Sequence, residues 1–100
     1  MKKMMEVEYV GIEDVQEIID YACAVMQKSE HYINVEVSNY RTKNVFVKCY
    51  IQLYGFNPES EIDHSFLFYM KDDKAEVDVM NECKDTLKKL LKEVEEHEIV

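Results

Sequence analysis

Three histidines, His31, His64 and His97, are the residues of this sequence best suited to acid–base or metal chemistry. Their separation along the chain matches no metal-ligand spacing. His64 falls on the apolar side of an alternating segment, where a core or core-rim histidine with a hydrogen-bond partner is expected rather than a catalytic base. The densest group of acids, within residues 72–78, lacks the loop pattern of an EF-hand. The 2 glycines are too few for a phosphate-binding loop. We therefore expect no enzymatic activity, no metal site and no cofactor.

The 3 cysteines, Cys23, Cys49 and Cys83, are odd in number and widely spaced, so no disulfide framework is predicted. Each falls on or beside an apolar stripe, which indicates small buried hydrophobic side chains.

A secretory signal is not expected, because Glu6 and Glu8 interrupt the segment that would have to be apolar. The longest apolar runs, such as 66–69, are far shorter than the roughly 20 residues that a membrane span needs. We expect a cytoplasmic protein with no membrane association.

The charge is strongly negative and unevenly placed. The chain has 21 acidic and 12 basic residues, a net charge of −9, which disfavours direct binding to nucleic acid. Residues 59–82 carry 8 acidic and 2 basic groups, whereas residues 31–58 are mildly basic. A focused acidic surface can steer a basic protein partner, including a nucleic-acid-handling enzyme whose phosphate groove it would occupy. The alternative, a surface that only keeps the protein soluble, stays open.

The hydrophobic periodicity predicts the elements that must position these groups. Alternation predicts strands at residues 4–10, 33–37, 45–54 and 62–70. Apolar residues three and four apart predict a helix from Ile12 to near Lys28 and a second helix over Glu82–His97. Residues 74–80 fit either a strand or the start of the second helix. The helix is favoured, because Asp73 and Glu76 have the spacing of a capping box.

These elements predict one α+β domain over residues 1–100. The expected order is β-α-β-β-β-α, with two helices packed on one face of a mainly antiparallel four-stranded sheet.

The sheet face away from the helices is expected to be aromatic. If the valine, isoleucine and cysteine side of the central strand packs inward, Phe46, Tyr50 and Tyr54 point outward. Tyr32, Tyr40, Leu67 and Tyr69 are expected to join them from neighbouring segments. Such a face can bind a protein partner or pair two copies of the chain, although tyrosine is also common on exposed strands.

The expected binding residues form two groups. The aromatic anchors are Phe46, Tyr50, Tyr54 and Tyr69, and the steering acids are Glu59, Glu61, Asp63, Asp72 and Asp73.

The predicted element order resembles that of ribosome hibernation factors, and its later part resembles a double-stranded-RNA-binding domain. This resemblance implies an RNA- or ribosome-associated domain as an alternative function. The basic helix faces that such proteins use are contradicted by Glu13, Glu17 and Asp20 on the first helix.

In size and acidity the chain also looks like small phage-encoded inhibitors of bacterial defence, such as anti-CRISPR proteins. The leading hypothesis is a small, non-enzymatic interaction protein that inhibits or regulates by occupying a partner. A small-molecule site between sheet and helices is a third alternative.

Overall fold

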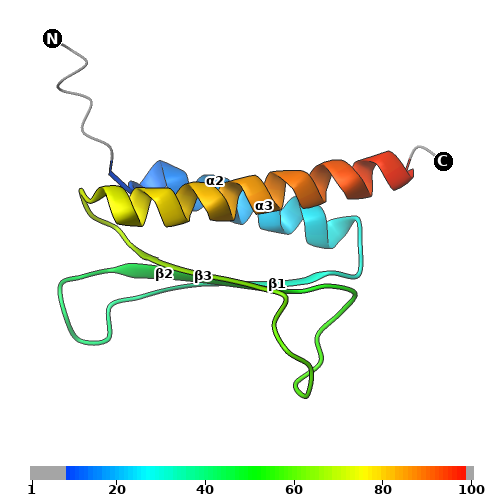
Figure 1. The fold of residues 1–100 in the computed structure, drawn as a ribbon, viewed down its shortest axis with the longest axis horizontal. Helices are drawn as coiled ribbons and strands as arrows, with labels where there is room; N and C mark the ends of the chain where they lie inside the picture. Colours follow the sequence, from blue (N-terminus) through cyan, green and yellow to red (C-terminus); the bar gives the residue numbers. More distant parts are fainter. Residues whose placement is uncertain (1–8, 99–100) are drawn as a thin grey trace, which may run out of the picture.

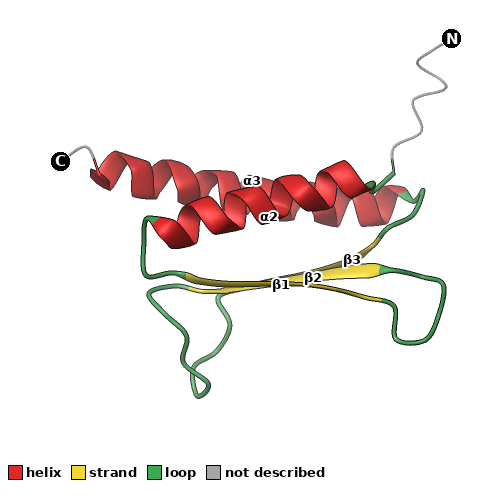
Figure 2. Ribbon diagram, turned by 180° about the vertical axis from the view of Figure 1, so that it is seen from behind, coloured by secondary structure: helices red, strands yellow, loops and turns green. Residues whose placement is uncertain are grey.

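The computed structural model describes residues 9–98 and shows three antiparallel strands covered on one face by two helices (Figure 1). The elements are α2 (Ile12–Gln27), β1 (Tyr32–Ser38), β2 (Phe46–Gln52), β3 (His64–Tyr69) and α3 (Lys74–Glu98). Both helices lie on the same side of the sheet (Figure 2). The expected α+β class, with two helices packed on one face of an antiparallel sheet, is confirmed.

The four-stranded sheet and the β-α-β-β-β-α order are not confirmed. The described order is α-β-β-β-α, and the sheet has three strands in the order β1-β2-β3. Most of the strand predicted at residues 4–10 lies outside the described residues. The two described residues of that segment, Tyr9 and Val10, are not in a strand, although the Val10 N–H donates to the Lys71 carbonyl at 3.4 Å.

Residues 74–80 form the first turns of α3, so the helix favoured for this segment by the sequence is confirmed. Asp73 caps the helix, because its Oδ1 accepts from the Ala75 N–H at 2.9 Å and its carbonyl accepts from the Val77 N–H at 3.0 Å. Glu76 does not complete a capping box. Its Oε1 accepts instead from the Tyr69 N–H at 2.7 Å and so ties the helix start to the end of β3.

The register of the sheet separates its two faces. Val35, Cys49 and Phe66 lie in one row across the three strands and face the helices. Ile51 and Phe68, on the same face, are fully buried with residues of both helices in one core. The helices run along the sheet, with α2 contacting β1 and α3 contacting β3.

An ion cluster joins the two helices beside this core. The Lys84 ammonium lies 2.6 Å from Asp14 Oδ1 and 2.9 Å from Glu17 Oε1. Burial raises the pKa of Asp14, but the hydrogen bonds from Lys84 and from the Gly11 N–H, together with the charge of Lys84, lower it by more, so that pKa is lowered overall. The hydrogen bond from Lys84 likewise lowers the pKa of Glu17. Burial lowers the pKa of Lys84, but the two carboxylates raise it by more.

The cysteines differ from the expectation at one position. Cys49 and Cys83 are buried in the core, as predicted, whereas Cys23 is exposed on α2. The pKa of the Cys83 thiol is raised by its hydrogen bond with Cys49 and by burial, which keeps this thiol protonated and unreactive.

Candidate protein-interaction surface

The sheet face that points away from the helices, called the open face below, is built from every second residue of each strand. Its rows run across the sheet through the central strand β2, at Phe46, Lys48, Tyr50 and Gln52. Their neighbours are Tyr32, Asn34, Glu36 and Ser38 on β1, and Ser65, Leu67 and Tyr69 on β3. Side chains directly opposite each other on one face of antiparallel strands are in contact range, so these residues form one surface.

One end of the open face is a compact aromatic cluster. The Phe46 ring lies 4.8 Å from the Tyr40 ring and 5.9 Å from the Tyr69 ring, measured between centroids. Phe46 is consequently only 5% exposed, although it lies on the open face as expected. Tyr40 and Tyr69, rather than Phe46, are the side chains that a partner would touch here.

The other end of the open face is a second aromatic group. Tyr32 lies 6.3 Å from Tyr50 and 5.0 Å from Phe56 between ring centroids. The pKa of the Tyr50 hydroxyl is raised by partial burial, by Tyr32 and by Glu36. The hydroxyl therefore stays protonated and can donate a hydrogen bond. Between the two aromatic ends, Glu36 and Lys48 face each other as a cross-strand pair beside the exposed Leu67.

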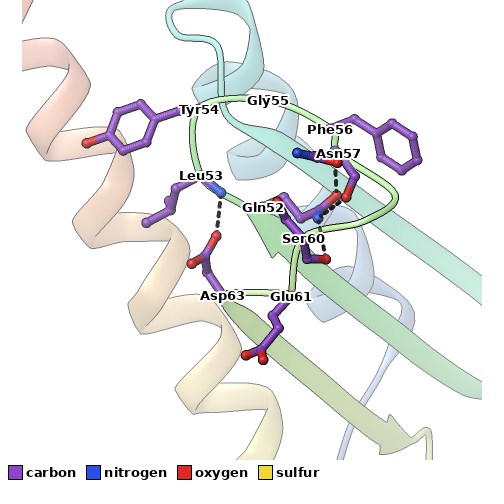
Figure 3. Close-up of a pocket in the computed structure, with 9 residues that line it drawn as sticks. All are labelled: Gln52, Leu53, Tyr54, Gly55, Phe56, Asn57, Ser60, Glu61 and Asp63. Carbon is purple, nitrogen blue, oxygen red and sulfur yellow. Dashed lines mark hydrogen bonds between the residues drawn. The ribbon is translucent and has the colours of Figure 1, made fainter.

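The loop of residues 53–63, between β2 and β3, extends from the sheet on the open side and forms a wall beside the second aromatic group (Figure 1). Gln52, only 4% exposed, holds this loop. Its Nε2 donates to the carbonyls of Asn57 at 2.8 Å and Ser60 at 3.3 Å, and its Oε1 accepts from the Asn57 N–H at 3.3 Å. Asp63 closes the base of the loop, because its Oδ2 accepts from the Leu53 N–H at 2.8 Å (Figure 3).

A hollow of about 180 Å³ lies where this wall meets the open face. Its apolar lining comes from Tyr50, Phe56, Pro58 and Ile62. We call it the anchor pocket, because its size and lining suit one inserted aliphatic or aromatic side chain. A larger hollow of about 470 Å³ inside the loop itself includes polar groups of Gln52 and the neighbouring loop residues (Figure 3).

Tyr54 is not part of the open face. The predicted strand ends two residues early, at Gln52, because the chain turns at Tyr54 and Gly55, whose φ angles are 65° and 119°. Tyr54 and Phe56 point to opposite sides of the loop (Figure 3). Tyr54 lies against the His31 ring at 5.0 Å and helps line a separate hollow of about 240 Å³ beside α3.

The structure does not bring the five predicted steering acids together. Asp63 and Asp73 accept backbone hydrogen bonds and stabilise a loop and a helix start, as described above. Glu59 and Glu61 are exposed on the 53–63 loop beside the anchor pocket. Asp72 lies at the opposite end of β3, on the link that rises to the helix layer (Figure 1). Only Glu59 and Glu61 are placed to influence a partner at the anchor pocket.

Three residues of the candidate surface were missed by the sequence reasoning: Phe56, Pro58 and Ile62. The signal that marks Phe56 is a large apolar side chain within an otherwise polar turn.

Groups that could support other functions are sparse in the described part of the chain. Residues 9–98 contain no cluster of three or more histidine, cysteine, aspartate or glutamate side chains able to hold a metal ion. Neither described helix is long and apolar enough to cross a membrane. Comparison with known protein families, curated proteins and solved structures finds no significant match.

Proposed function

We propose that this chain is a non-enzymatic interaction protein that binds a protein partner through its open face and acts by occupying it. The observation that carries the proposal is the anchor pocket, set beside the exposed Phe56 and the half-buried Tyr32 and Tyr50. Aromatic side chains around a small pocket are the usual composition of a binding hot spot.

The charges around the pocket indicate the chemistry of the partner. Glu59 and Glu61 are exposed and alternate along the chain with Pro58, Ser60 and Ile62, which line the pocket, and the chain as a whole carries a net charge of −9. A partner segment with one apolar side chain flanked by lysine or arginine would complement both features. The phosphate groove of a nucleic-acid-handling enzyme has such a basic surface. An inhibitor or regulator of the kind encoded by phages and mobile elements would act in this way.

The RNA-associated alternative is less well supported. Aromatic side chains on an open sheet can stack bases, but they need nearby positive charge. Among the described residues that form the open face, Lys48 is the only cation, and Glu36 lies directly opposite it. Arg41 and Lys43 lie in the loop at the other end of the face, away from the anchor pocket.

Photo-crosslinking from within cells tests this proposal with a matched pair of positions. Phe56 and Tyr54 are two residues apart, are 60% and 78% exposed, and point to opposite sides of one loop. A benzophenone amino acid at position 56 is expected to give a discrete protein adduct, and the same amino acid at position 54 is expected to give none. Equal adducts from both positions, or adducts from position 54 alone, would place binding away from the open face. A purified adduct that contains RNA instead would support the alternative function.

A further inference from the structure

β1 is an edge strand that lacks the usual protection against pairing. No described segment pairs with its outer side, since the sheet order is β1-β2-β3. Over Tyr32–Ser38 the strand contains no proline, glycine or lysine, and its register with β2 is continuous, without a bulge. Proteins normally block exposed edges with such features, because the free N–H and C=O groups recruit another strand.

The flank of α2 above this edge is apolar and uncharged. The exposed residues Ile12, Ile19, Cys23 and Met26 follow one another at spacings of seven, four and three, so they lie on one side of the helix. The opposite side faces α3, as the contact between Asp14 and Lys84 shows. Because α2 contacts β1, the apolar flank projects beyond the β1 edge.

The inner face of β1 is also incompletely covered. Val37 belongs to the row that contains the buried Val47 and Phe68, but it is itself 50% exposed. The other edge of the sheet differs, because α3 places Lys89 and Glu93 near His64 of β3. An added strand beside β1 would bury apolar side chains, whereas one beside β3 would have to bury charges.

The sequence of β1 is complementary to itself in antiparallel pairing. Pairing centred on Val35 places Val35 opposite its own copy, Val37 opposite Ile33, Glu36 opposite Asn34, and Ser38 opposite Tyr32. The inner face then contains only valine and isoleucine, and each Glu36 carboxylate meets an amide that can donate to it. Centring on Glu36 would instead oppose two like charges.

We propose that two copies of the chain pair through their β1 edges about a two-fold axis at Val35, forming one six-stranded antiparallel sheet. A two-fold interface uses the same patch on both copies, which fits the self-complementary register. Two chains that each carry a net charge of −9 repel each other, so their contact must be largely uncharged. The β1 edge and the α2 flank meet this requirement with one ionisable carboxylate per copy, Glu36. The open face stays free in this dimer and becomes twice as wide.

Sedimentation of the full chain at increasing concentration tests the proposal. The unmodified chain is expected to reach twice the 11.9 kDa mass of one copy. Val37→Lys places an inward-pointing charge at the edge and is expected to weaken the dimer at least about tenfold. Leu67→Lys is the matched control, because Leu67 is 52% exposed but lies on the open face of β3. The control variant is expected to remain dimeric.

Other outcomes overturn the proposal. A dimer lost with Leu67→Lys and kept with Val37→Lys would place self-association on the open face. A full chain that stays monomeric at every concentration would show that a second copy does not occupy the edge. That conclusion would hold even if a chain lacking residues 1–8 formed a dimer. Far-UV circular dichroism of each variant verifies that the fold is retained, and Ile19→Glu on the α2 flank gives a second, independent disruption.

Discussion

Replacing Gln52 by methionine tests how the wall of the anchor pocket is held. The substitution keeps the side-chain volume and removes three hydrogen bonds. The bond to the Asn57 carbonyl measures 2.8 Å, and the bonds to the Ser60 carbonyl and from the Asn57 N–H each measure 3.3 Å. A net intramolecular hydrogen bond contributes about 0.5–1.5 kcal/mol, and the two longer bonds belong at the lower end of that range. Gln52→Met should therefore lower the free energy of unfolding by about 2 kcal/mol, or the melting temperature by about 10 °C.

The chain has no tryptophan, so urea unfolding is followed by far-UV circular dichroism rather than by tryptophan fluorescence. Glu61→Gln is the matched control on the same loop, because Glu61 is exposed, and it should change stability by less than about 0.5 kcal/mol. Amide chemical-shift changes in the Gln52→Met variant should concentrate in residues 53–63. Equal stabilities for the two variants, or amide chemical-shift changes spread through the helices, would refute the conclusion that Gln52 holds the loop.

Three further predictions concern stability and reactivity. Lys84→Met should destabilise the protein by about 1 kcal/mol at neutral pH. Because the folded-state pKa values of Asp14 and Glu17 are lowered, that contribution is fully present above the ordinary carboxyl range and should decline progressively as the pH falls below about 4. A difference in thermal melts between the variant and the unmodified protein that does not shrink over this range would contradict the ion cluster. Asp73→Ala removes the cap of α3 and should cost about 1 kcal/mol in urea unfolding, with an unchanged value arguing against capping. Cys23 should react with a thiol reagent in the native state, whereas Cys49 and Cys83 should react only after unfolding. Rapid reaction of all three thiols in the native state would contradict the core packing.

The sequence predicts the helices well because their apolar spacing is set locally. The start of α3 is the clearest case, since Val77 and Met80 continue the stripe into a segment that also alternates like a strand. Asp73 decides between the two by supplying the cap. The faces of β2 are likewise predicted, because the side-chain period of a strand is two.

The candidate surface is harder to predict because it depends on where the chain leaves the sheet. Alternation continues through Tyr54 in the sequence, but the chain already turns there and carries Tyr54 away from the open face. The role of Gln52 was not visible, since an outward polar residue on a strand usually faces water. Its contacts with the loop bring Phe56 and Ile62 to the pocket.

The acidic segment shows why a cluster in sequence is not a cluster in space. Residues 59–63 and 72–73 are separated by the whole length of β3, so they lie at opposite ends of the sheet. Backbone hydrogen bonds to Asp63 and Asp73 depend on turns whose geometry the composition does not specify.

The central claim is that a protein partner is bound at the open face, and the affinity of the crosslinked partner for two loop variants tests it most directly. Phe56→Ala removes one wall of the anchor pocket, whereas Tyr54→Ala removes a side chain of similar size from the other side of the same loop. We predict that Phe56→Ala weakens binding at least about tenfold and that Tyr54→Ala changes it less than about twofold. Equal affinities for the two variants, or a larger loss with Tyr54→Ala, would contradict the claim.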